Sequence, residues 1–192
     1  MLTALDEEVA LICVDLQAGI LRMPVNRDTA ELAARAGTLA TAFRAHDKSI
    51  VAVTVGGSPP GRTERGPQAV DLSDDFTTPS PALNVGPPDI EVRKTAWGAL
   101  TGTDLQQRLT ERGTRQLVIC GISTSIGVES TARAAFDLGY HVVIATDLIA
   151  DTSPEAHANS LERIFPRMAE LATSRDLLSA LRAHAGIRHI SN

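Results

Sequence analysis

The chain has 192 residues, of which 43% are hydrophobic and 21% charged, and its formal net charge is −5. This length and composition predict one domain over 1–192 with its own hydrophobic core. The negative charge, without a Lys/Arg cluster interleaved with aromatic residues, disfavours nucleic acid or an anionic membrane as partner. We therefore expect a small-molecule partner.

The cysteines and the N-terminus indicate the compartment. Cys13 and Cys120 both lie inside apolar runs, which favours buried, inert thiols in a reducing compartment over a disulfide. The opening MLTALDEEVA has acids where a signal peptide needs basic residues. No apolar run approaches the roughly 18 residues of a membrane span. We expect a cytoplasmic protein.

The first half of the chain predicts two strands, a helix and a long loop. Residues 9–16, VALICVDL, form an apolar run that is typical of a strand buried in a parallel sheet. Apolar residues at helical spacing predict a helix over 27–47, and β-branched residues predict a strand over 49–55. Residues 56–88 hold most of the prolines. Such a long loop is usually functional or disordered, and we expect it to lie over the site.

The second half continues the alternation of strands and helices. Strands are predicted over 89–94, 116–123, 141–147 and near 168–172, and helices over 102–113, 125–139, 153–170 and 174–184. Thr103 and Ser153 are the expected N-caps of the helices over 102–113 and 153–170. Pro166 should end or bend the helix over 153–170. Six strands joined by crossovers predict an α/β fold with a mostly parallel, Rossmann-like six-stranded sheet and helices on both faces. Ligands of such sheets bind at the carboxyl edge.

A set of residues lies at or just past the ends of the predicted strands. They are Asp15, Gln17, Gly56, Gly57, Lys94, the run from Gly121 to Gly127, and Asp147. Asp15 and Lys94 carry opposite charges, and in a partly dry cleft such a pair lowers the pKa of the acid, as in many hydrolytic sites. Taken singly, each residue also has a simpler explanation, Asp15 as a turn former and Lys94 as a solvated lysine.

The segment after strand 116–123 matches none of the common catalytic motifs. Neither Ser123 nor Ser125 completes the Gly-x-Ser-x-Gly nucleophile elbow, and the glycines fail the dinucleotide fingerprint. The five histidines show no ligand spacing with acids or cysteines. We therefore expect no protein-bound metal and no cofactor.

Three segments together resemble a known family. ALICVDLQAGI, KTAWGALTGTDLQQRLTERG and LVICGISTSIGVESTARAAFDLGYHVVIATD are similar to the signature segments of the isochorismatase-like hydrolases, also called the cysteine hydrolase superfamily. The resemblance covers residues 9–172 in family order and spacing. It implies the fold predicted above, hydrolase activity, and assembly into a homo-oligomer, as a dimer or tetramer.

The resemblance also implies roles for single residues. The catalytic aspartate of the family falls on Asp15 and its lysine on Lys94. A non-proline cis peptide bond, common after the fourth strand, would lie between Ile122 and Ser123. The expected substrate pocket comprises Gln17, Trp97, Ile122, Ser123, Ser125 and Ile126.

Position 127 departs from the family pattern. The nucleophilic cysteine of the amidase members falls on Gly127, which cannot attack a substrate. The Asp-x-His metal motif of nicotinamidases is also missing, because the chain has TVGGSPPG at that place. Isochorismatases proper hydrolyse a vinyl ether without the cysteine, using the aspartate as acid and water as nucleophile. A positioned acid contributes roughly 10² to 10⁴ in rate, which suits an enol ether better than an unactivated amide.

Two alternatives stay open at this point. One is a degenerate member that binds a small molecule without turnover. The other is an ester, lactone or amide hydrolase that uses Ser123, Ser125 or bound water. The sequence shows no clear arginine cluster for the two carboxylates of isochorismate, although Arg62, Arg65 and Arg93 could contribute from loops.

Overall fold

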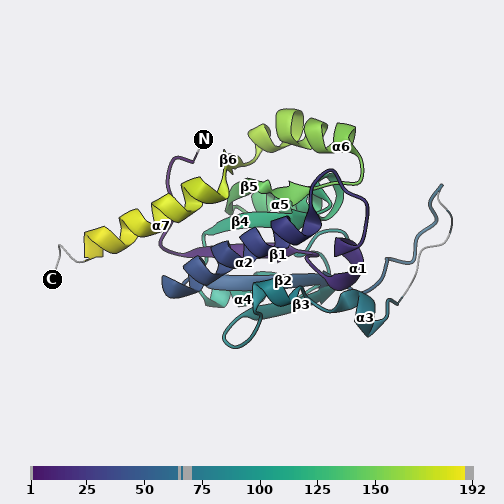
Figure 1. Cartoon of the computed structure of the whole chain (residues 1–192), viewed down its shortest axis with the longest axis horizontal. Helices are drawn as coiled ribbons and strands as arrows, with labels where there is room; N and C mark the ends of the chain where they lie inside the picture. Colours follow the sequence, from purple (N-terminus) through teal and green to yellow (C-terminus); the bar gives the residue numbers. More distant parts are fainter. Residues whose placement is uncertain (1, 65, 67–70, 189–192) are drawn as a thin grey trace.

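The protein forms one six-stranded parallel sheet, seen in a computed structural model that describes residues 2–64, 66 and 71–188 (Figure 1). The strand order is β3-β2-β1-β4-β5-β6, and every neighbouring pair is parallel. The strands are β1 Val9–Val14, β2 Ser49–Val55, β3 Ile90–Lys94, β4 Gln116–Ile122, β5 His141–Ala150 and β6 Glu170–Ala172. The predicted α/β sheet is confirmed.

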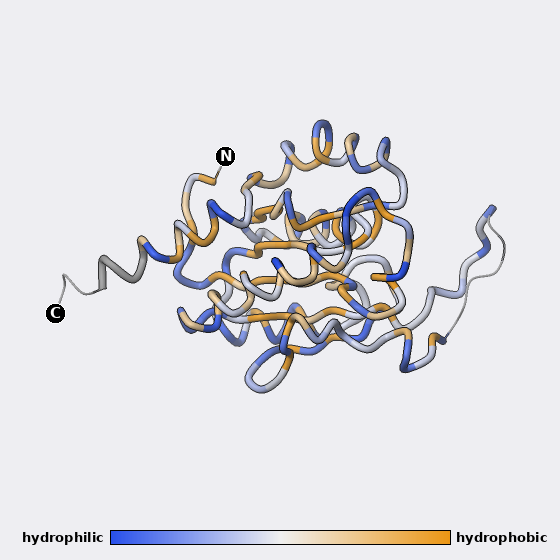
Figure 2. Tube along the Cα trace, in the orientation of Figure 1, coloured by the Kyte–Doolittle hydropathy of each residue, from blue (hydrophilic) through white to orange (hydrophobic). Residues whose placement is uncertain are grey.

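Helices cover both faces of this sheet. α2 (Thr29–Ala45) and α7 (Ser174–Arg188) pack on one face, and α4 (Leu105–Glu111) and α5 (Glu129–Asp137) on the other. Figure 2 shows the apolar strands as the layer between them. The remaining helical segments are α1 Ala18–Leu21, α3 Asp74–Thr77, η1 Pro81–Leu83, η2 Thr124–Val128, α6 Pro154–Asn159, η3 Ser160–Ile164 and η4 Phe165–Arg167. Within the described residues, no helix is long and apolar enough to span a membrane.

The helix ends follow the predicted capping chemistry with one shift. The Ser153 side chain accepts a hydrogen bond from the Ala156 N–H at 3.1 Å, so Ser153 is the N-cap of α6 as predicted. Pro166 lies in the 3₁₀ turn that ends this helical region, because proline has no N–H to continue it. α4 begins at Leu105, inside the predicted range 102–113, and its N-cap is Asp104 rather than the predicted Thr103.

β5 is longer than predicted, and this corrects the position of one edge residue. The strand continues to Ala150, after a register shift in its pairing with β4 between Ile119 and Gly121. Asp147 therefore lies inside the strand, where it pairs with Arg35, instead of at the carboxyl edge. The residue that follows β5 at that edge is Asp151.

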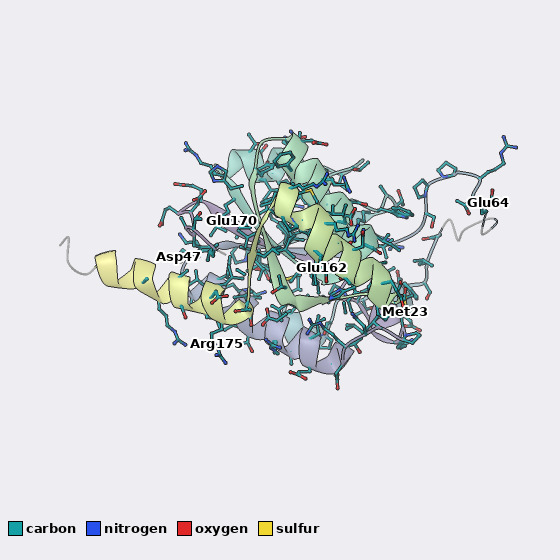
Figure 3. All side chains as sticks on the ribbon, turned by 90° about the horizontal axis from the view of Figure 1, so that it is seen from above. Met23, Asp47, Glu64, Glu162, Glu170 and Arg175 are labelled. Atoms are coloured by element: carbon teal, nitrogen blue, oxygen red, sulfur yellow. The ribbon has the colours of Figure 1, made fainter. Side chains whose placement is uncertain are left out.

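Only part of the segment 56–88 lies beside the carboxyl edge, where Pro79 forms an antiparallel bridge with Gln17 and the Ser80 N–H donates to the Leu16 carbonyl. Residues 57–64 extend away from the sheet, with Glu64 far out on the same side of the molecule as Met23 (Figures 1 and 3). Arg93 is bound within this region, because it donates to Asp71 Oδ1 at 3.1 Å and to the Leu72 carbonyl at 3.2 Å. Of the other two arginines considered, Arg62 is exposed on the extended segment and Arg65 lies outside the described residues.

Candidate active site

Asp15 and Lys94 meet at the carboxyl edge of the sheet. Asp15 follows β1 and Lys94 ends β3. Because β2 lies between these strands, the long side chain of Lys94 reaches across one strand to Asp15. Lys94 Nζ donates to Asp15 Oδ2 at 2.8 Å. The Lys94 side chain is 2% exposed and that of Asp15 7%. Asp15 has a φ of 53°, a left-handed conformation that aspartate tolerates better than most residues.

The pKa of Asp15 is shifted opposite to the expected direction. Burial raises the pKa of this carboxyl from 3.8 to about 6, although the charge and hydrogen bond of Lys94 lower it. The prediction of a lowered pKa was wrong in its net direction, because the loss of hydration outweighs the attraction of one ammonium group. A carboxyl with such a pKa keeps a protonated fraction close to neutral pH, as an acid catalyst requires.

The two oxygens of the Asp15 carboxyl have different surroundings. Oδ2 accepts from Lys94, whereas Oδ1 exposes less than 1 Å² and has no hydrogen-bond partner among the described residues. Buried polar atoms without a partner are uncommon in folded proteins. Within the described residues, Oδ1 is therefore the carboxyl oxygen that is left free to bind a further group.

Gly127 lies against the same carboxyl. A Cβ atom at this position would be 3.0 Å from Asp15 Oδ2 and 3.1 Å from Val14 Cγ1. Any side chain here would press on Asp15, so the glycine lets the turn η2 approach the acid closely. Gly121 in β4 lets that strand approach the end of β1, because a Cβ atom there would be 1.9 Å from the Val14 carbonyl oxygen and its φ is 132°.

The turn between β4 and α5 is fixed by an acid that sequence reasoning missed. The peptide bond between Ile122 and Ser123 is cis, and η2 follows as one π-helical turn. Ser125 donates its N–H and its hydroxyl to Asp151 Oδ2, at 2.7 and 2.8 Å. Asp151 is buried, and the apolar residues between 147 and 151 were the signal that β5 continues to it.

A buried histidine also contacts this turn. The Thr124 hydroxyl lies 2.8 Å from His157 Nδ1 of α6. Burial, and then the positive charge of Arg27, lower the pKa of His157, while Asp151 raises it. A neutral imidazole can accept a hydrogen bond from the Thr124 hydroxyl, so this contact helps to hold the start of η2. The sequence contains no motif that would have indicated the pairing.

The other residues of the predicted pocket lie in different environments. Gln17 is fully buried, and its side chain donates to the Val55 and Phe76 carbonyls and accepts from the Val55 N–H. Ile122 is also buried. Trp97 and Ile126 are 62% and 37% exposed, and both adjoin Gly127. The structure thus brings Asp15, Lys94 and Gly127 into contact and leaves Trp97 and Ile126 at the surface beside them.

The two cysteines lie in the core, away from the surface. Cys13 and Cys120 are paired across β1 and β4, with 3.7 Å between their sulfur atoms, and both are free. The hydrogen bond with Cys13 and then burial raise the pKa of the Cys120 thiol well above its ordinary value. Their predicted burial is confirmed. Among the residues that the structure describes, no three His, Cys, Asp or Glu side chains are grouped to hold a metal ion.

The chain was compared with known families, proteins and structures. The profile of the isochorismatase domain matches residues 9–176. The chain is 43% identical over 180 residues to the uncharacterized isochorismatase family protein YecD of Escherichia coli O157:H7, which covers 90% of this chain and 95% of YecD. It is 35% identical over 184 residues to the uncharacterized isochorismatase family protein YwoC of Bacillus subtilis (strain 168), covering 92% and 95%.

A solved structure shows the same architecture. An isochorismatase family protein from Burkholderia thailandensis superposes with a TM-score of 0.89 at 36% sequence identity, over 93% of this chain and 98% of that one. The family predicted from the three signature segments is therefore confirmed. The chain belongs to the isochorismatase family and is a hydrolase.

Proposed function

We propose that this hydrolase cleaves a C–O bond of a small molecule, with a vinyl ether or related substrate favoured, by acid catalysis from Asp15 and without a thioester. The observation that carries the proposal is the Asp15 carboxyl, which has one oxygen bound to Lys94, one buried oxygen without a partner among the described residues, and a pKa of about 6. The resemblance to the amidases implies that their cysteine falls on Gly127, and glycine offers no nucleophile.

The chemical steps follow from this arrangement. Asp15 Oδ1 donates its proton to the terminal carbon of the vinyl ether, which leaves a cation stabilised by the ether oxygen. Water adds to that cation and returns a proton to the Asp15 carboxylate. The resulting hemiketal then breaks its C–O bond to give a ketone and an alcohol. Lys94 stabilises the carboxylate that exists between the two proton transfers.

A serine nucleophile is less well supported by the geometry. The Ser125 hydroxyl donates to Asp151 Oδ2, and the same oxygen also accepts the Ser125 N–H. A carboxylate engaged in this way is a weak base for an alcohol, whereas serine hydrolases use a histidine in reach of the hydroxyl. In this chain His157 contacts Thr124 instead.

The test is a substrate panel read by mass spectrometry. The protein is incubated with isochorismate, simpler vinyl ethers, esters, lactones and small amides, in water enriched in ¹⁸O. We expect products from a vinyl ether, with ¹⁸O in the ketone and no mass increase on the protein. Cleavage of esters or amides alone would contradict the proposed bond type. Binding without any product would indicate a degenerate binding protein.

The reaction should slow as the pH rises through the pKa of Asp15. Because the protonated acid is the active form, kcat/KM is expected to be level below about pH 6 and to fall about tenfold per pH unit above it. The measurement is a pH–rate profile with the best substrate of the panel. A rate that increases from pH 5 to 8 would instead indicate a general base.

Alkylating reagents should leave the activity unchanged. Cys13 and Cys120 are buried and lie in the core, and the pKa of Cys120 is raised, so iodoacetamide should not reach a reactive thiolate under native conditions. Turnover is measured before and after treatment, with incorporated label counted in native and in unfolded protein. Loss of activity in step with alkylation would overturn the thiol-free mechanism.

A further inference from the structure

The buried hydroxyl of Thr131 joins the two chain segments that flank Asp15. It donates to the Gly127 carbonyl at 2.7 Å, and it accepts from the Ala99 N–H at 3.0 Å. Gly127 belongs to the turn against the Asp15 carboxyl, and Ala99 follows the strand that ends at Lys94. A single side chain thus links the turn beside the acid to the segment after its lysine partner.

We propose that Thr131 is a positioning residue of this site, which sets how closely the η2 turn and the segment after Lys94 enclose the Asp15 carboxyl. The inference rests on the proposed function insofar as Asp15 is the acid. Thr131 itself is assigned no contact with the substrate.

The packing around Thr131 supports this role. Thr131 is fully buried, and Ala99 has no exposed surface either. A Cβ atom at Gly98 would be 3.2 Å from the Ser130 carbonyl oxygen, so the segment after Lys94 lies closely on α5. The Trp97 carbonyl oxygen is 3.7 Å from the Cβ position of Gly127. The η2 turn and the segment after Lys94, which flank the Asp15 carboxyl, therefore meet at Thr131.

Loss of the Thr131 hydroxyl affects both the η2 turn and the segment after Lys94. Without it, the Gly127 carbonyl and the Ala99 N–H lose their shared partner in a buried place, and both groups need water instead. Water that enters between the turn and the segment also reaches the Asp15 carboxyl. Since burial is the largest cause of the raised pKa of Asp15, added hydration should move that pKa back toward 3.8.

The test compares Thr131→Val with Thr131→Ser and with Thr41→Val. Valine has nearly the shape of threonine but no hydroxyl, and serine keeps the hydroxyl. Thr41 is the control for the hydrogen bond alone, because its hydroxyl also donates four residues back along a helix, to the Gly37 carbonyl at 2.9 Å, but at an exposed position of α2 on the other face of the sheet. The pKa of Asp15 is followed by carboxyl ¹³C NMR, with Asp15→Asn identifying the signal.

In Thr131→Val we expect a lower pKa for Asp15 and a kcat reduced about tenfold or more, with KM changed less than about twofold. Thr131→Ser and Thr41→Val should retain the wild-type pKa and kcat. A valine variant that melts at a lower temperature but keeps both values would show a merely structural role and overturn the inference. If it does not fold, Thr131→Cys replaces it, since a thiol donates only weakly.

The two proposals fail in different ways. If the wild-type protein cleaves nothing in the substrate panel, the proposed function is wrong, and the NMR comparison still decides the role of Thr131. If the wild type is active and the valine variant retains both its Asp15 pKa and its kcat, the inference about Thr131 is wrong while the acid mechanism stands.

Discussion

Asp15→Asn is expected to lower turnover by at least about 10²-fold while the substrate still binds. Asparagine keeps the size of the side chain and can still accept from Lys94 at 2.8 Å, but it has no proton to give at pH 5 to 8. Turnover and ligand affinity are measured on the same preparation. The fall in rate above about pH 6 should disappear from any residual activity.

Thermal stability separates this outcome from a structural effect. Asp15→Asn leaves the buried Lys94 ammonium without its anion, so this variant is expected to unfold at a lower temperature than the wild type, and turnover must be compared per folded molecule. If Asp15 served only as the turn residue with φ 53°, asparagine would tolerate that conformation equally well, and turnover per folded molecule would stay unchanged. Full turnover in this variant would exclude Asp15 as the acid.

Lys94→Met is expected to lower the free energy of unfolding by about 3–5 kcal/mol at pH 8, because it leaves a buried carboxylate without its cation. The loss should be smaller at pH 5. Without Lys94 the pKa of Asp15 rises further, so at pH 5 the carboxyl folds in its neutral form, whereas at pH 8 folding must either bury the charge or take up a proton. Urea denaturation at the two pH values gives this comparison.

Lys48, the residue before β2, provides the matched control. Lys48 Nζ pairs with Glu7 Oε1 at 2.9 Å, with the Lys48 side chain 6% exposed but that of Glu7 51% exposed. Lys48→Met should therefore cost no more than about 1 kcal/mol of unfolding free energy, with little dependence on pH.

In the double variant Asp15→Asn with Lys94→Met, the losses of turnover should be strongly non-additive, because the two residues act as a unit. Additive losses would contradict the pairing.

The strands and the meeting of Asp15 with Lys94 could be predicted, because both depend on local patterns. Continuous apolar runs indicated β1, β2 and β4, and parallel strands bring their carboxyl ends to one edge. The family resemblance then pointed to the same two residues. The sequence could not give the direction in which the pKa of Asp15 shifts, because that depends on how completely the folded protein excludes water.

Other features depend on contacts between segments that are distant in the chain. Asp151 reaches Ser125 only because β5 shifts register against β4 and continues past residue 147. Gln17, predicted in the pocket, has its side-chain amide bound to the backbone of Val55 and Phe76. No local pattern reports such pairings. The outward course of residues 57–64 was likewise not indicated by their proline and glycine content.

The contact between Gly127 and Asp15 limits how such a protein can evolve. We propose that position 127 is where thiol-bearing relatives keep their nucleophile, and here a Cβ atom would lie 3.0 Å from Asp15 Oδ2 and 3.1 Å from Val14 Cγ1. A mutation to cysteine would therefore disturb the existing acid before the new thiol could be useful. The side chains of Val14 and Asp15 would have to shift by a few tenths of an ångström to admit the Cβ atom, so a thiol at position 127 changes the setting of the acid even where the fold is kept.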